Sequence, residues 1–141
     1  MDESVQSPEI NTFSLVALRD RLLPDLLQDD ESNILYWAGK SLARREEFSS
    51  ITAIEIYFSR IGFGNLKALG HKGTEIKWEL TGPIVGARLA ERTEASFYLE
   101  AGFLAQALET LSGVGTEAQV NVADDIATFD VLTESSVDLP I

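Results

Sequence analysis

Leu80–Leu111, with the sequence LTGPIVGARLAERTEASFYLEAGFLAQALETL, is the most informative stretch of this chain. The Gly82-Pro83 pair predicts the start of a helix, because proline suits the first helical position. A second helix is predicted over Ala101–Leu111, and Gly113 ends it. Small residues in this second helix leave room for another element to lie close against its backbone: Gly102, Ala105 and Ala107.

Two hairpins are predicted from alternation of apolar and polar residues. The first pairs residues 65–69 with residues 74–80, where Ile76, Trp78 and Leu80 alternate with polar residues, and its turn is expected at residues 70–73. The second follows the long helix. It pairs residues 118–122 with residues 127–131, and Asp124-Asp125 forms its turn.

Helices are expected before the first hairpin. One starts at Asn11 or Thr12, and Pro24 predicts a kink or a restart in it, because proline cannot continue the helical hydrogen-bond ladder. Another covers residues 33–45. A third runs from about residue 50 to residue 61, where Gly62 supplies a left-handed stop.

Hairpins interleaved with helices, without strand–helix–strand crossovers, predict an α+β fold in which helices cover one face of an antiparallel sheet. We expect a single α+β domain over residues 11–134. Residues 1–10 and 135–141 are expected to be flexible tails, since they lie outside the periodic segments.

The net charge of −12 is unevenly placed. Residues 1–35 carry −6, residues 36–92 carry +3, and residues 93–141 carry −9 without any basic residue. This acidic third would repel a phosphate backbone or an anionic membrane, so no nucleic acid is expected as a partner. No membrane insertion is expected either, because no run approaches the roughly 18 apolar residues of a spanning segment. The negative net charge is explained by a contribution to solubility, and binding to a basic partner is the alternative explanation.

The chain has no cysteine and one histidine. Disulfides and cysteine-ligated metals are therefore excluded, which is compatible with the cytoplasmic location that we expect. His71 lies in the predicted turn, where an exposed side chain is the ordinary case. The chain has no phosphate-binding glycine loop and no nucleophile–histidine–acid set, so we expect no catalytic residue, no metal and no cofactor. Glu100 has two interpretations: it complements the dipole of the helix that it opens, or it is a partly buried carboxylate facing a ligand or Arg88.

Five segments, in order, resemble the YslB-like family of small proteins of Gram-positive bacteria. They are LLPDLL (Leu22–Leu27), YWAGKSLAR (Tyr36–Arg44), GFGNL (Gly62–Leu66), ELTGPIV (Glu79–Val85) and LEAGFLAQALE (Leu99–Glu109). The same order is similar to the wider superfamily of 4-vinyl reductase domains and TRAPP vesicle-tethering subunits. This resemblance implies a four-stranded antiparallel sheet packed on helices, often dimeric through the helical side. It also implies small-molecule binding, and in some TRAPP subunits an acyl chain occupies an apolar channel.

The chain departs from this pattern in one respect. Related 4-vinyl reductase domains carry cysteines around the last helix and hairpin, with a metal role. Here residues 114–131 contain neither cysteine nor histidine. A metal site of that type is therefore not expected.

Aromatic residues with nearby glycines are the candidate ligand contacts. Glycines reduce side-chain volume and would leave a pocket, although close packing of helices needs the same glycines and aromatic residues are usually core. The candidates are Trp37, Gly39, Trp78, Gly82, Gly86, Gly102 and Phe103.

Two functions follow from this pattern. The first is a non-enzymatic binding module for a small apolar or amphipathic molecule held between helices and sheet. The second is an interaction module, a homodimer formed through an exposed apolar face at residues 22–27 and 36–43. An enzyme built on carboxylates is the least favoured interpretation, because no spacing selects a pair of acids.

Overall fold

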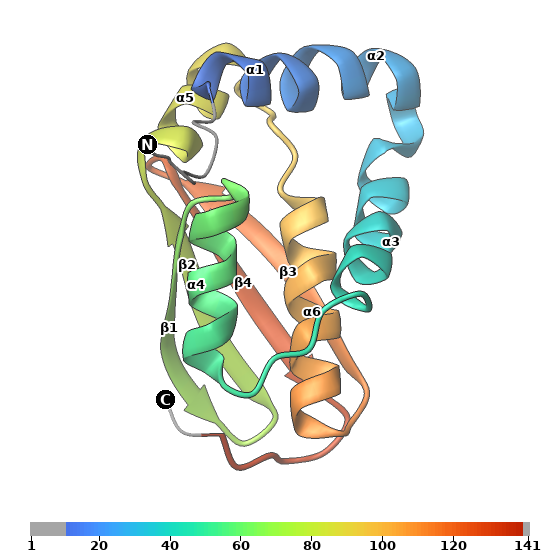
Figure 1. Ribbon diagram of the computed structural model, residues 1–141, viewed down its shortest axis with the longest axis vertical. Coiled ribbons are helices and arrows are strands. Elements are labelled where there is room, and N and C mark those ends of the chain that lie inside the picture. Colours follow the sequence, from blue (N-terminus) through green and yellow to red (C-terminus); the bar gives the residue numbers. More distant parts are fainter. Residues whose placement is uncertain (1–10, 140–141) are drawn as a thin grey trace, which may run out of the picture.

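The computed structural model describes residues 11–139, and helices and a single sheet form two layers (Figure 1). The sheet is antiparallel, with the strand order β1-β2-β4-β3. The predicted class, a four-stranded antiparallel sheet with helices packed on one face, is confirmed. The elements are α1 (Thr12–Ala17), η1 (Leu18–Leu22), α2 (Leu23–Leu27), η2 (Gln28–Asp30), α3 (Glu31–Ala43), α4 (Ile51–Ile61), β1 (Asn65–Lys72), β2 (Glu75–Thr81), α5 (Pro83–Glu91), α6 (Tyr98–Ser112), β3 (Thr116–Ala123) and β4 (Ile126–Thr133).

The sheet buries one face and leaves the other polar, as expected for strands with period-two alternation. Trp78 of β2 lies opposite Phe129 of β4, and both side chains are fully buried beneath the helices. On the other face the Lys77 ammonium lies 2.7 Å from the Asp130 carboxylate, and both groups contact solvent. The core therefore fills the space between the helices and one side of the sheet.

The turns of the two hairpins differ in how well the sequence predicted them. Asp124 and Asp125 form the second turn, both with positive φ, as a two-residue hairpin requires. The first turn is Gly73-Thr74, because β1 continues to Lys72. The prediction of a turn over residues 70–73 was therefore wrong at its start. A bulge between Ala68 and Gly70 shifts the pairing and lets the strand continue.

Helix α6 lies along the sheet and α3 packs against it. Helix α6 begins at Tyr98, three residues before the predicted start at Ala101. A Cβ atom at Gly102 would clash with the backbone of Tyr36, and one at Gly39 would lie 2.7 Å from the amide nitrogen of Phe103. The two glycines let the backbones of α3 and α6 come into direct contact.

The N-terminal helical segment, residues 12–30, crosses one end of the molecule beside α5 and above the start of α6 (Figure 1, blue). Its middle turn, η1, is a π-helical turn that directly precedes Leu23 and Pro24. Pro24 has no N–H and therefore restarts the helix, as predicted. Helix α3 follows from Glu31, two residues before the predicted start.

Both edge strands have a backbone N–H that a helix side chain covers. Ala68 N in β1 donates to the Glu55 carboxylate of α4 at 3.1 Å, and Ala118 N in β3 donates to the Tyr36 hydroxyl of α3 at 2.9 Å. Such contacts protect sheet edges against pairing with another chain.

The two predicted tails lie at or beyond the limits of the described residues. Residues 1–10 and 140–141 lie outside them. In the described part of the C-terminal segment, Val137 and Leu139 are partly buried against the core.

Candidate functional site

The candidate aromatic residues do not share one hollow. Trp78 and Phe103 are fully buried, and Phe103 stacks on Tyr57 with ring centroids 5.0 Å apart. Trp37 lies on the outer side of α3 with 62% of its surface exposed. Two of the three aromatic candidates therefore belong to the core and the third faces solvent.

The candidate glycines have separate structural places. Gly39 and Gly102 form the close contact between α3 and α6. Gly82 has a φ of 113° directly before α5, and Gly86 lies within α5 with no atom within 4 Å of an added Cβ. Helix packing and helix initiation account for three of these four glycines.

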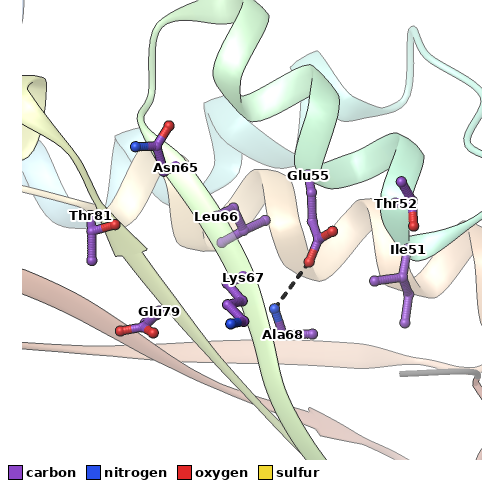
Figure 2. Close-up of a pocket in the computed structure, with 9 residues that line it drawn as sticks. All are labelled: Ile51, Thr52, Glu55, Asn65, Leu66, Lys67, Ala68, Glu79 and Thr81. Carbon is purple, nitrogen blue, oxygen red and sulfur yellow. Dashed lines mark hydrogen bonds between the residues drawn. The ribbon is translucent and has the colours of Figure 1, made fainter.

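A wide groove runs between α4 and the edge strand β1 (Figure 2). Its volume is about 530 Å³, and it is open to solvent along its length. Figure 2 shows the Glu55 carboxylate reaching across from α4 to the N–H of Ala68. Of the two acids that line this groove, Glu55 and Glu79, Glu55 is therefore engaged in covering the sheet edge.

A smaller and more enclosed cavity lies beneath the N-terminal helical segment, with a volume of about 200 Å³. Six helical elements and the Gly62-Phe63 turn contribute to its wall, which is mostly apolar. The lining residues are Leu15, Leu18, Arg19, Leu42, Ile61, Gly62, Phe63, Ile84, Arg88, Leu99 and Glu100. None of the seven candidate ligand contacts, Trp37, Gly39, Trp78, Gly82, Gly86, Gly102 and Phe103, lines this cavity.

The polar part of the wall belongs to a buried charged cluster, defined here as Arg19, Asp20, Arg88 and Glu100. Each residue is at most 7% exposed. Arg19 donates to both oxygens of Glu100 at 2.9 and 2.7 Å, and Arg88 donates to both oxygens of Asp20 at 2.8 and 3.0 Å. Arg88 Nη1 also lies 3.3 Å from Glu100. Two bidentate pairs thus connect η1, α5 and α6.

Backbone and ring contacts complete the cluster. The carbonyl oxygen of Ser96, in the loop before α6, accepts from Arg88 at 2.6 Å and from Arg19 at 3.3 Å. The Arg88 guanidinium lies 4.5 Å from the centroid of the Phe97 ring. The cluster therefore fixes the loop that leads into α6 against the N-terminal helical segment.

Glu100 stays ionised in this setting. Burial by itself raises the pKa of the carboxyl group, but Arg19 and Arg88 outweigh burial and hold the pKa below its ordinary value of 4.5. Burial likewise opposes the charge on Arg19, and Glu100 reverses that effect and raises the pKa of the guanidinium. Two cations face two anions, so the cluster has no net formal charge.

One nitrogen of Arg19 has no hydrogen-bond partner among the described residues. Among the described residues, three buried polar side-chain atoms have no hydrogen-bond partner: Arg19 Nε, Trp78 Nε1 and Gln106 Oε1. Of these three residues, Arg19 is the one that lines the cavity. A buried donor without a partner costs about 1–3 kcal/mol, and the Nε atom itself is inaccessible to a molecule the size of water, although the residue Arg19 lines the cavity.

Within residues 11–139, a metal site, a membrane-spanning helix and a role for His71 have less support than binding in the cavity. No group of three or more histidine or acidic side chains is arranged to hold a metal ion, and no helix is long and apolar enough to cross a membrane. His71 Nε2 lies 3.1 Å from the Gly73 carbonyl oxygen in the first hairpin.

The sequence pointed to two members of this site, Glu100 and Arg88, and not to the residues around them. Glu100 and Arg88 were considered together, and the structure places them in contact. Arg19 and Asp20 were missed, because charged residues in an amphipathic helix are usually on the solvent side. The adjacent charges of opposite sign at 19–20, followed by Pro24, are the signal that could have indicated an irregular, inward-facing turn.

Comparison with known families gives one match that covers most of the chain. A family described as "Protein of unknown function (DUF2507)" matches residues 12–132. The chain belongs to this family. It is also 36% identical over 110 residues to the uncharacterised protein YslB of Bacillus subtilis strain 168, a match that covers 78% of this chain and 74% of that protein. The expected resemblance to YslB-like proteins is confirmed.

Solved structures show the same fold at low sequence identity. The phenol-responsive sensory domain of the transcription activator PoxR, solved with phenol, is similar with a TM-score of 0.59 and 12% identity, over 87% of this chain and 75% of that one. A vinyl-4-reductase family protein from Methanocaldococcus jannaschii has a TM-score of 0.56 and 20% identity, over 91% of this chain and 84% of that one. The fold expected from the sequence is confirmed by these structures.

Proposed function

We propose that this protein is a non-enzymatic binding module for a small, mainly apolar molecule, held in the cavity beneath the N-terminal helical segment. The observation that carries the proposal is a partly enclosed apolar cavity of about 200 Å³ with a buried charged cluster in its wall. Ligand sites are concave and mostly apolar, with a few placed polar groups. A sensory domain with a similar fold supports the same class of role by analogy of fold.

An open hollow on the surface provides a route to this cavity. The hollow lies between the starts of α1 and α5 and the end of α4, and it shares Leu15, Gly62 and Ile84 with the cavity. Gly62 has no side chain, so the side chains of Leu15 and Ile84 are the ones that separate the hollow from the cavity at these shared positions. A ligand then enters without unfolding of the N-terminal helical segment.

The charges in the site support binding rather than catalysis. Asp20 and Glu100 are each held by a guanidinium at two oxygens, and the lowered pKa of Glu100 leaves it without a proton at neutral pH. A general acid or base needs a pKa near the working pH and access to a substrate proton. The cluster provides neither at Glu100.

Benzene is the first probe, because it tests for an apolar cavity without requiring a hydrogen bond. NMR titration of the amide signals should show saturable binding that is centred on residues around the cavity. Ile84→Trp fills the cavity and should weaken binding at least severalfold, whereas Ile56→Trp makes the same change at an exposed site of α4 and should leave it unaltered. Absence of benzene binding, or equal binding by both variants, would refute the proposal.

A second candidate function is homodimerisation through the helical side. Leu18, Leu22 and Leu26 recur at four-residue spacing along the N-terminal helical segment and are 46–67% exposed, and Ile34 and Trp37 of α3 are exposed as well. Exposed apolar patches of this kind mark interaction sites. Light scattering after size exclusion tests this idea. A dimer that Leu26→Glu converts to monomer, and that Leu69→Glu on β1 does not, would support it. A monomeric wild type would exclude it.

A further inference from the structure

The N-terminal helical segment closes one side of the cavity. It contributes Leu15, Leu18 and Arg19 to the wall, and the other lining residues come from α3, α4, α5, α6 and the turn after α4. Among residues 12–30, Val16 is the one apolar residue that is fully buried. Four large apolar residues of the segment are 46–67% exposed: Phe13, Leu18, Leu22 and Leu26. Apolar burial therefore holds this segment less firmly than it holds the core helices.

Buried charges attach the segment to the rest of the domain. Each side carries one cation and one anion, which are Arg19 and Asp20 on η1, and Arg88 and Glu100 on α5 and α6. Arg88 and Glu100 also contact each other at 3.3 Å. If the segment moves away, this pair stays together in the domain, and the two charges that leave become hydrated. Separation therefore leaves no buried charge without a partner, which is the main cost of breaking a buried ion pair.

Separation also hydrates a group that has no partner in the closed arrangement. Arg19 Nε is buried and makes no hydrogen bond with the described residues, and water would satisfy it once the segment has moved. One further ion pair, between Arg21 and Glu91 at 2.9 Å, lies at the surface. Surface pairs of this kind contribute little to stability, so this pair is a weak restraint.

The segment has a strained residue near its C-terminal end. Gln28 has a φ of 49° and a ψ of −126°, in a region that glycine adopts readily and other residues avoid. Three residues later the start of α3 is fixed, because the buried Glu31 carboxylate accepts from Arg92 at 2.9 and 2.8 Å. Hinges are a few residues at the ends of elements that absorb a change in backbone angles. A strained residue before an anchored helix fits that description.

Movement about Gln28 would open the cavity at the other end of the segment. Helix α1 lies at that end and carries Leu15, which separates the cavity from the surface hollow together with Ile84 of α5. Moving Leu15 away from Ile84 joins the two spaces. The helical hydrogen bonds within the segment stay intact during this movement.

We propose that the N-terminal helical segment is a hinged lid, which turns about Gln28 to admit the ligand and is held closed by the buried charged cluster. The inference rests on the proposed binding function and adds how access to that site is controlled. It predicts an opening that costs less free energy than global unfolding and exposes little surface.

Thiol labelling at position 16 measures this opening. The chain has no cysteine, so Val16→Cys places a single thiol on the buried side of the lid. Val131→Cys is the matched control, because Val131 is fully buried in β4 and is reached only by global unfolding. A water-soluble aromatic disulfide should label Val16→Cys about a hundredfold faster, at a rate that dilute urea barely changes, whereas labelling of Val131→Cys should accelerate steeply with urea.

The same measurement can contradict the lid. Equal labelling rates with equal urea dependence at the two positions would overturn the inference, because the segment would then separate only when the whole domain unfolds.

A crosslink tests whether the opening controls access to the cavity. Arg21 and Glu91 join the segment to α5 at the surface, so the double variant Arg21→Cys with Glu91→Cys can be crosslinked with dibromobimane, a short bifunctional thiol reagent. The control is the same double variant with each thiol capped by iodoacetamide. Benzene should associate about tenfold more slowly with the crosslinked form, as measured by NMR exchange, with an affinity within about twofold of the capped form.

The outcomes separate this inference from the function on which it rests. Equal association rates in the crosslinked and capped forms would overturn the lid, because access would not depend on movement of the segment. If benzene binds neither these forms nor the wild type, the proposed function fails. The hinge is then judged by labelling of Val16→Cys alone, which requires no ligand.

Discussion

Replacing Gly102 with alanine is expected to destabilise the protein, although alanine is the better helix former. Within α6 the change should gain about 1 kcal/mol of helix propensity. The added Cβ, however, would lie 2.8 Å from the Tyr36 carbonyl carbon and 3.0 Å from its Cα, and closer still to the carbonyl oxygen. These are backbone atoms of α3, so no side-chain rotation relieves the clash and the helices must separate. Overpacking costs about 1–3 kcal/mol or more. We expect a net loss of about 2 kcal/mol.

Gly86→Ala is the matched control for this prediction. Gly86 lies inside α5 and has no atom within 4 Å of an added Cβ. The propensity gain then acts alone, and the variant should be more stable by up to about 1 kcal/mol. Urea unfolding followed by far-ultraviolet circular dichroism measures both variants. If Gly102→Ala is as stable as the wild type, α3 and α6 are not in backbone contact and the reasoning fails.

Three further predictions concern buried polar contacts. Glu100→Gln should cost about 3–5 kcal/mol in urea unfolding, because it leaves buried Arg19 and Arg88 short of an anion, whereas Glu91→Gln at the surface should barely move the urea midpoint. The stability difference between wild type and Glu100→Gln should shrink as pH falls below about 4.5, since a lowered pKa means that the folded protein binds this proton more weakly than the unfolded chain. Tyr36→Phe removes the acceptor of the Ala118 N–H and should cost about 1 kcal/mol, with faster hydrogen exchange at that amide.

Much of the fold could be predicted from local sequence. Alternation at Ile76, Trp78 and Leu80 identified β2, because a strand with one buried face must alternate. Gly62 and Gly113 ended their helices where predicted, both in the left-handed conformation. The first turn was misplaced, because the bulge after Ala68 depends on pairing with β2 and has no local signal.

The candidate site could be predicted only in part. Small residues at 39 and 102 correctly indicated that something lies close to those helices. Glycines occur in a helix both where another helix packs closely and where a ligand pocket lies beside it, so the sequence does not distinguish the two. In this structure Gly39 and Gly102 form contacts between helices. The cavity is formed instead mainly by large apolar residues from several elements, and no local pattern in the sequence distinguishes them from other apolar residues.

The sequence by itself determined the order of helices and strands, the hairpin at Asp124-Asp125 and the restart at Pro24, since each depends on residues within one or two turns of chain. Only the tertiary structure decided that Arg19 faces Glu100, which lies 81 residues further along the chain. Burial of a charge is favourable only when its partner is already in place, and that partner is brought there by the packing of other elements. The buried Nε of Arg19 and the cavity that Arg19 lines follow from that packing and not from any local pattern.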